Sequence, residues 1–336
     1  MGSTKRLMTK IGIILLALIV IGVAIYLLGP KPSTPKFETV NITLTSDLEL
    51  LERQIYENEK LTPGIRQGCE AKIVWADSMA KIKTKLAFLY IHGGTSTHVE
   101  GAPIHRNIAK RYNANLYLAR LAGHGVDLGD STLAAETADD YVHSAEHALA
   151  VAKSLGNEVI VMGTSFGGAL TTYLASRHPE IKAIILYSPC IETYDTRTGI
   201  FTKPWGLQLV KFISGSETVD IQAPSAEYAR YWTTHYSLNF IAQFQNFLSH
   251  ANTPEAFAKI KCPVFMGYWY KNENVKDTIA SVPAMLKMFK ELGSADKQKQ
   301  AFPNAGNHGL PTPILSKDVE SVQKATEGFL DRIIYP

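Results

Sequence analysis

The sequence is short of cysteines, of charges and of like-charge runs, and each shortage excludes a class of protein. Three cysteines in 336 residues, none in a C-x-x-C pair, exclude a disulfide scaffold and argue against a structural zinc site. The 34 Lys and Arg nearly balance the 31 Asp and Glu, and no five like charges stand together, so the chain lacks the electrostatic signature of a nucleic-acid-binding protein. With 46% hydrophobic residues, the chain is too apolar for intrinsic disorder and can bury a sizeable core.

One long hydrophobic run stands near the N-terminus. Residues 11–28 contain no charge and no proline, and as a helix they would span about 27 Å, close to the hydrocarbon core of a bilayer. Three basic residues precede this run, and two lysines follow it closely. Because the more positive flank marks the cytoplasmic side, we expect residues 1–10 in the cytoplasm, a transmembrane signal anchor at 11–28, and the rest of the chain on the extracytoplasmic (periplasmic) side.

A cleaved secretory signal is the alternative interpretation of this run. A signal peptide would normally have a shorter apolar region of about 7 to 15 residues, followed by a small-x-small cleavage site. Gly22-Val23-Ala24 fits such a site poorly, and Gly29-Pro30 fits it worse. The run therefore favours an uncleaved anchor, followed by a proline-rich linker over residues 29–37.

Residues 38–336 alternate strand and helix signals, which predicts a mostly parallel sheet with helices on both faces. The stretch 86–91 has no polar alternation, as expected for a strand covered on both faces. A helix is predicted over 139–155 with Thr137 as its N-cap, because apolar residues recur there at spacings of three and four. A helix over 47–59 is expected to lie outside the core. The remaining strands are expected at 71–76, 115–119, 159–162, 183–187, 264–267 and near Gln300, and the remaining helices at 167–178, after Ser281 and at 317–333.

The alternation of strands and helices breaks between residues 191 and 258. This stretch is rich in aromatic residues and predicts a mostly helical lid insertion above the sheet. Two interpretations of the aromatics stay open: they roof an active site, or they form only the core of the insertion.

The segment Gly163-Thr164-Ser165-Phe166-Gly167 predicts catalytic chemistry. This G-x-S-x-G pattern stands between a predicted strand and a predicted helix, where a tight turn strains the central residue and exposes its hydroxyl. Glycines on both sides of Ser165 remove side chains that would collide. The bare pattern is common, but in this strand–turn–helix context it indicates a nucleophilic serine rather than an ordinary glycine-rich turn.

An activated serine needs a base and an acid that orients the base. Of ten histidines, His308 is the candidate base, because it lies in a loop of small residues between the last strand and the last helix. The acid is expected in the loop after the strand at 264–267, just before the next helix. Asp277 is preferred over Glu273 because it stands closer to that helix, although either residue fits the loop.

Two other histidine motifs are interpreted as structural. His124 lies in a Gly-His-Gly loop and is expected to shape that loop. His143 and His147 stand four residues apart on a predicted helix, a spacing that a metal site could use. They lack the Glu and third ligand of an H-E-x-x-H site, so surface histidines are the preferred interpretation.

Two backbone amides are the expected donors to an oxyanion. One is the N–H of Phe166, the residue after the candidate nucleophile. The other is expected in the loop His92-Gly93-Gly94-Thr95, whose glycines let the backbone approach a substrate closely. We select the N–H of Gly94 as this second donor.

Together, the H-G-G loop, the G-H-G loop, G-T-S-x-G-G, the distal aspartate and the late N-H-G resemble the α/β-hydrolase superfamily, with the catalytic order Ser165, Asp277, His308. The resemblance covers residues 45–334 and is greatest to the bacterial serine-aminopeptidase-like and monoacylglycerol-lipase-like branch. It implies the α/β-hydrolase fold and hydrolysis through an acyl-enzyme, with no metal or organic cofactor. The expanded loop before Asp277 departs from the pattern of the family.

The expected function is a serine hydrolase that cleaves carboxylic esters through an acyl-enzyme, a carboxylesterase or lipase-like enzyme for apolar esters, with a small-molecule ester as its substrate. A serine aminopeptidase-like peptidase is one alternative, and it would need a cluster of carboxylates in the insertion to hold a substrate ammonium. A non-catalytic binding protein on the same fold is the other, but the serine, the acid and the histidine are all present. The carboxylates available in the insertion, which form no cluster in the sequence, are Glu192, Glu217, Asp220 and Glu227.

Overall fold

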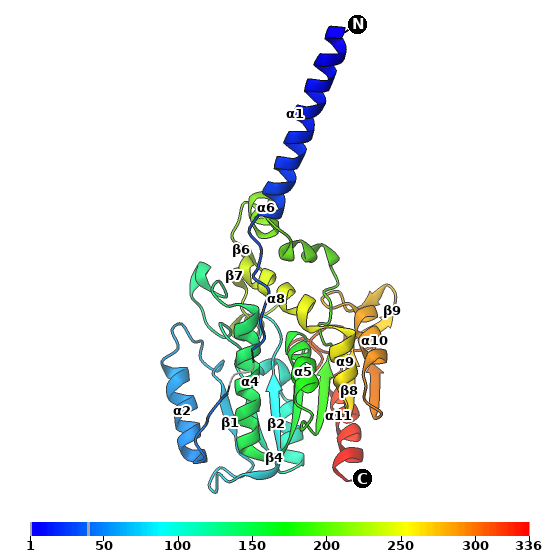
Figure 1. Cartoon of the computed structure of the whole chain (residues 1–336). Helices are drawn as coiled ribbons and strands as arrows, with labels where there is room; N and C mark the ends of the chain where they lie inside the picture. The colour runs from blue at the N-terminus through cyan, green and yellow to red at the C-terminus, as the bar shows by residue number, and fades with distance from the viewer. Residues whose placement is uncertain (1, 39–40, 336) are drawn as a thin grey trace.

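The computed structural model describes residues 2–38 and 41–335 and shows an α/β domain from which one long helix projects (Figure 1). This helix, α1 (Gly2–Leu27), is exposed along its whole described length from residue 5 onward. Its segment Lys5–Leu27 is long and apolar enough to cross a membrane. Since no side chain of residues 5–28 is buried, this part of α1 contributes nothing to the core of the domain.

A seven-stranded sheet forms the centre of the domain, in the order β1-β3-β2-β4-β5-β8-β11. The pair β1 and β3 is antiparallel, and the other neighbouring pairs are parallel, which confirms the predicted mostly parallel sheet. The carboxyl ends of the parallel strands therefore share one edge, where sites of such folds lie. The strands are β1 (Lys72–Val74), β2 (Thr84–Ile91), β3 (Asn115–Leu118), β4 (Gly156–Thr164), β5 (Ala183–Tyr187), β8 (Val264–Tyr268) and β11 (Lys297–Ala301).

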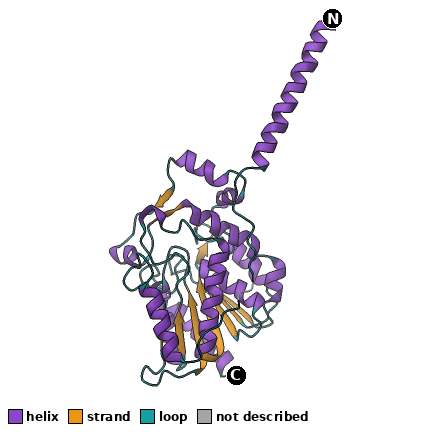
Figure 2. Ribbon diagram, turned by 60° about the vertical axis from the view of Figure 1, so that its left-hand side comes forward, coloured by secondary structure: helices purple, strands orange, loops and turns teal. Residues whose placement is uncertain are grey.

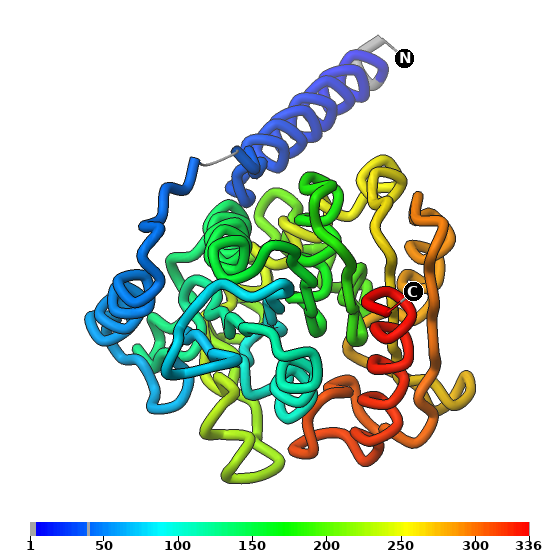
Figure 3. The backbone as a smooth tube through the Cα atoms, turned by 90° about the horizontal axis from the view of Figure 1, so that it is seen from below, coloured from blue at the N-terminus to red at the C-terminus, as the bar shows by residue number. Residues whose placement is uncertain are grey.

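Helices cover both faces of the sheet (Figures 1 and 2). Alternate residues of β2 point to opposite faces, so Phe88 and Tyr90 join the core cluster under α3 and α11, whereas Leu89 and Ile91 join the cluster under α2, α4, α5 and α10. Seen from below, α2 and α11 lie at opposite sides of the domain (Figure 3). The covering helices are α2 (Leu48–Lys60), α3 (Ile104–Arg111), α4 (Ala138–Leu155), α5 (Phe166–Arg177), α10 (Val282–Glu291) and α11 (Val319–Ile334).

Local signals predicted the start of α4 correctly, but two helices differ from expectation. Thr137 caps α4 through a reciprocal capping box with Asp140. The expectation that α2 lies outside the core is wrong, because Leu51 and Ile55 on one face of this helix are buried in the main core cluster. Helix α3 was not expected, since it has only eight residues and a short apolar pattern.

The insertion over residues 191–258 is mostly helical, as predicted, and lies above the carboxyl ends of the strands (Figure 1). Its aromatic residues divide between two environments. Phe201 belongs to a small core within the insertion, whereas Phe240 and Phe247 join the main core cluster. The elements of the insertion are η3 (Thr196–Thr202), α6 (Gly206–Ser214), β6 (Thr218–Asp220), α7 (Ala226–Tyr231), β7 (His235–Ser237) and α8 (Leu238–Ala251), and α9 (Pro254–Lys259) follows at its end.

Candidate functional site

Ser165 lies in the sharp turn between β4 and α5. Its backbone has φ 54° and ψ −116°, a conformation that a residue with a side chain rarely adopts. The Ser165 N–H donates to the carbonyl of Tyr187 at 2.9 Å, and the Ser165 carbonyl accepts from the N–H of Cys190 at 2.9 Å. The end of β5 and the loop after it therefore hold the strained turn in place.

Gly167, two residues after Ser165, allows α5 to start directly against the end of β2. A Cβ at Gly167 would lie 2.0 Å from the carbonyl oxygen of Ile91 and 2.5 Å from that of His92, so no other residue fits here. This close approach places the N-terminus of α5 beside the loop that follows β2.

Asp277 and His308 are joined directly, although 31 residues separate them. Nδ1 of His308 lies 2.5 Å from Oδ2 of the fully buried Asp277. The other oxygen of Asp277 accepts from the N–H groups of Ile279 at 2.8 Å and Ala280 at 3.0 Å, just before α10 begins. Glu273, the alternative acid, has a side chain that is 77% exposed and pairs with Lys276. The structure therefore brings Asp277, and not Glu273, to the imidazole.

A small hairpin explains the expanded loop before Asp277. Its two antiparallel strands are β9 (Tyr270–Asn272) and β10 (Val275–Lys276). The hairpin carries Glu273 at its turn and returns the chain to the sheet, where the Asp277 N–H donates to the carbonyl of Trp269 at 3.2 Å. The extra residues thus project outward and leave Asp277 at the edge of the sheet.

The environment of His308 raises the pKa of its imidazole. Burial alone would lower this pKa, but the charge and hydrogen bond of Asp277 and the charge of Glu100 outweigh burial. The second ring nitrogen, Nε2, is buried and has no hydrogen-bond partner among the described residues, so it is not bonded to the Ser165 hydroxyl. Hydrogen bonds between nucleophile and base are often long in unliganded sites, and Nε2 is free to accept a proton.

Glu100 is a buried carboxylate beside Ser165 that was not identified from the sequence. Its Oε2 accepts from the N–H of Gly93 at 2.6 Å and from the hydroxyl of Ser96 at 2.9 Å. A Cβ at Gly93 would lie 3.0 Å from Cβ of Ser165 and 2.9 Å from Oε2 of Glu100, so the loop is wedged between these two side chains. Burial raises the pKa of Glu100. A sequence signal existed, because Glu100 is the one Asp, Glu, Lys or Arg between residues 86 and 105.

The two amides expected to bind an oxyanion lie on the segments that this packing brings together. Neither the N–H of Gly94 nor that of Phe166 donates to an acceptor within the described part of the chain. The Phe166 N–H is the first of α5, where the helix dipole adds positive potential. Both groups are thus available to an external acceptor.

A model of the alpha/beta hydrolase family matches residues 88–319, a range that contains Ser165, Asp277 and His308. The chain belongs to this family. A thermostable monoacylglycerol lipase of Bacillus sp. (strain H-257) is 34% identical over 104 residues, which cover 31% of this chain and 40% of that lipase. The chain therefore matches less than half the length of this relative.

Solved structures with this fold span nearly all of the domain. A structure described with the lipolytic enzymes LipS and LipT has a TM-score of 0.63 at 18% identity and covers 80% of this chain and 99% of its own. A soluble variant of monoglyceride lipase from Saccharomyces cerevisiae has a TM-score of 0.57 at 18% identity and covers 79% and 91% respectively. At these identities the likeness shows the α/β-hydrolase fold.

Aromatic residues of the insertion lie over the site of this α/β hydrolase. A Cβ at Gly94 would lie 2.9 Å from Cζ of Phe240, and the ring of Phe244 meets that of Phe166 edge-on with 4.8 Å between centroids. The insertion is also bonded to the loop after β2, because the N–H of Thr233 donates to the carbonyl of Thr95 at 2.7 Å. Apolar rings therefore cover both segments that carry the candidate oxyanion donors.

The remaining candidate groups lie elsewhere or pack structurally. His124 is buried against Phe240, and burial lowers its pKa to about 4, so its ring is neutral at pH 7. The described residues contain no group of three or more His, Cys, Asp or Glu side chains that could hold a metal ion. In the insertion, Glu217 pairs with Lys211 and Asp220 with His235 at the surface, so these carboxylates form no ammonium site beside Ser165.

Proposed function

We propose that this α/β hydrolase cleaves carboxylic esters through an acyl-enzyme, with Ser165 as nucleophile, His308 as base and Asp277 as the orienting acid. The observation that carries the proposal is the buried hydrogen bond between Asp277 and His308, at the same edge of the sheet as the strained serine turn. The similarity to a monoacylglycerol lipase over 104 residues supports an ester as the substrate.

The proposed reaction follows from these positions. The Ser165 hydroxyl attacks the ester carbonyl carbon and gives its proton to Nε2 of His308, while the negative oxygen binds the amides of Gly94 and Phe166. The imidazolium then protonates the departing alcohol, leaving an acyl group on Ser165. A water molecule loses its proton to Nε2 and attacks the acyl carbon, and the serine leaves with that proton. Asp277 stabilises the imidazolium in both halves of the reaction.

The rings of Phe240 and Phe244, which form a roof over the site, favour apolar acyl groups in the substrate. Each methylene buried against Phe240 and Phe244 contributes about 0.8 kcal/mol, which corresponds to about a fourfold gain. We therefore expect kcat/KM for p-nitrophenyl butyrate to exceed that for the acetate at least about fivefold, with the octanoate at or above the butyrate. An aminoacyl anilide is the matched peptidase substrate and should be turned over far more slowly. A steady fall of kcat/KM with chain length, or faster anilide hydrolysis, would contradict the proposed substrate class.

We also propose that α1 anchors the enzyme in a membrane, with residues 1–10 in the cytoplasm and the catalytic domain on the extracytoplasmic side. Support comes from the length and apolar composition of Lys5–Leu27 and from the complete exposure of its side chains. A soluble protein would leave this apolar surface in water, at a cost that a bilayer removes. The three basic residues before the run favour the stated orientation.

Glu100→Gln tests the role of the buried carboxylate in this reaction. His308 must be neutral to accept a proton, and the charge of Glu100 helps to raise the His308 pKa. Removing this charge should lower that pKa, so the acidic limb of the kcat/KM profile should move to lower pH. The profile is measured with a soluble ester between about pH 5 and 9, a range around the ordinary imidazole pKa. If the acidic limb of the kcat/KM profile stays unchanged in a folded Glu100→Gln protein, the Glu100 charge does not act on His308.

A further inference from the structure

Helix α6 presents a stripe of exposed apolar side chains. Trp205 precedes the helix, and Leu209, Phe212 and Ile213 follow at helical spacing, so the four residues share one side. Phe212 is 85% exposed and Ile213 is 74% exposed. Large apolar side chains that adjoin one another on a surface mark an interaction site, unlike the single exposed residues found on every protein.

The folding of the insertion does not require this outward stripe. The opposite side of α6 carries Leu207 and Val210, which pack against the small core formed by Phe201, Leu238 and Ala242. That inward face accounts for the attachment of α6 to the insertion. The stripe faces away from this core and has no apolar partner that buries Phe212 or Ile213 among the described residues.

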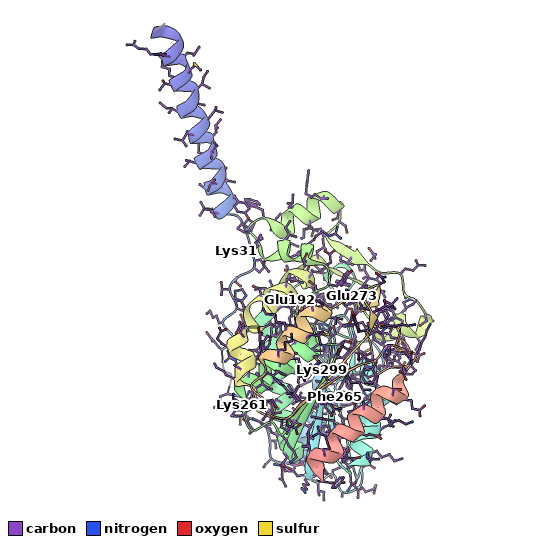
Figure 4. All side chains as sticks on the ribbon, turned by 90° about the vertical axis from the view of Figure 1, so that its right-hand side faces the viewer. Lys31, Glu192, Lys261, Phe265, Glu273 and Lys299 are labelled. Atoms are coloured by element: carbon purple, nitrogen blue, oxygen red, sulfur yellow. The ribbon has the colours of Figure 1, made fainter. Side chains whose placement is uncertain are left out.

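The stripe lies at the end of the apolar helix α1. Nε1 of Trp205 donates to the carbonyl of Ile25 at 2.9 Å, and the Trp205 N–H donates to the carbonyl of Pro30 at 2.8 Å. A Cβ at Gly29 would lie 2.0 Å from Nε1 of Trp205, so the chain passes directly against the indole. Figures 2 and 4 show α6 crosswise to α1 at this end, and Figure 4 labels Lys31 nearby.

We propose that α6 is a second membrane contact, an interfacial helix whose stripe of Trp205, Leu209, Phe212 and Ile213 enters the outer surface of the bilayer that α1 spans. The proposal rests on the anchor proposed for α1. If residues 11–28 cross the hydrocarbon core, the last turn of α1 and residues 29–30 lie close to the headgroup level. The contacts of Trp205 with Ile25 and Pro30 then bring α6 to the same level.

The chemistry of the stripe fits a lipid surface. A tryptophan with an apolar ring and one N–H donor is favoured at the headgroup boundary, and a helix lying in that plane buries its apolar side among the acyl chains. Lys31 and Lys203 are exposed and stand close in sequence to Pro30 and Trp205, which make the contact, so they can meet lipid phosphates. Because α6 packs against α8, which carries Phe240 over the site, the same contact would hold the roof of the active site at the bilayer surface.

The test separates α6 from the anchor by using the chain that starts at Gly29. Residues 5–28, whose side chains the structure describes, are all exposed, so the truncated domain is expected to fold. It should bind and float with vesicles of phosphatidylcholine and phosphatidylglycerol. A Phe212→Asp/Ile213→Asp variant should bind at least about tenfold more weakly, because it places two charges where apolar groups enter the lipid. The full-length chain with the same two substitutions should remain in membranes after alkaline extraction, because α1 still holds it.

A matched control carries two aspartates at equally exposed apolar positions elsewhere. Met79 and Ile82, 90% and 64% exposed, lie between β1 and β2 at the opposite end of the sheet, and their substitution should leave vesicle binding unchanged. The proposal would be overturned if the truncated chain fails to bind, if the α6 variant binds equally well, or if the chain forms a solution dimer that the α6 substitutions dissociate.

Hydrolysis of a water-soluble ester by the same samples is expected to be equal in all variants. Its absence from every sample would contradict the proposed activity and leave the binding result intact.

Discussion

Ser165→Ala is expected to lower ester turnover by about 10⁴-fold or more, the largest effect of any single substitution in the site. The reason is that nucleophile, base and acid act as a unit, so removal of the attacking oxygen abolishes acyl-enzyme formation. The oxyanion amides and substrate binding would remain and supply only residual catalysis. The measurement is kcat/KM for p-nitrophenyl butyrate, together with labelling by a fluorophosphonate, which should be lost completely.

The substitution should leave the fold intact. The strained backbone at Ser165 is held by two hydrogen bonds, one that its N–H donates to Tyr187 and one that its carbonyl accepts from Cys190, and alanine keeps both. Ser176→Ala, on the same helix, is the matched control: it removes a hydroxyl that donates to the carbonyl of Tyr173 and should preserve activity. Turnover by Ser165→Ala within tenfold of the unmodified enzyme, at an unchanged melting temperature, would contradict the assignment of the nucleophile.

Features predicted correctly from the sequence are those whose causes are local. The G-x-S-x-G turn, the Thr137 cap and the buried strand β2 each depend on a few neighbouring residues and on burial that the composition reveals. The alternation of strands and helices predicts a parallel sheet, and parallel strands place the loops after β2, β4 and β11 at one edge. This is why Ser165 and His308 could be selected before their surroundings were known.

Features that escaped prediction depend on contacts between distant segments. Glu100 was overlooked because its place beside Ser165 depends on the packing of the loop after β2 against the serine turn, which lies far along the chain. The burial of Leu51 in α2 and the contact between Trp205 and the end of α1 likewise depend on pairs far apart in the chain. Periodicity and capping carry no information about such pairs, so these residues look like ordinary loop or surface positions in the sequence.

The choice between Asp277 and Glu273 as the acid also depends on contacts that the sequence does not reveal. Both stand in one loop, and sequence distance to the following helix is the only criterion that separates them. The β9–β10 hairpin decides their positions physically, because its turn carries Glu273 outward to Lys276 while its return leaves Asp277 under His308. A hairpin with strands this short has too few residues for its alternation to be recognised.

Asp277→Asn is therefore expected to lower kcat/KM by about 10³ to 10⁴-fold, whereas Glu273→Gln should change it less than about twofold. In the asparagine variant, the side-chain oxygen can still accept from the N–H groups of Ile279 and Ala280, which turns the amide NH₂ toward Nδ1 of His308. Nδ1 must then accept a hydrogen bond, so the proton of the neutral ring moves to Nε2. A ring with Nε2 protonated cannot take the proton of Ser165.

The two variants separate the catalytic role of the acid from its structural role. Both keep the size of the side chain, and the backbone contacts of Asp277 are preserved, so melting temperatures should stay close to that of the unmodified enzyme. Loss of the Asp277 charge should also lower the His308 pKa, because that carboxylate is the main opposing influence to burial. The small remaining activity of Asp277→Asn should then show its acidic limb at lower pH. A severe loss in Glu273→Gln with little effect of Asp277→Asn would mean that the hairpin rearranges in solution and brings Glu273 to the imidazole.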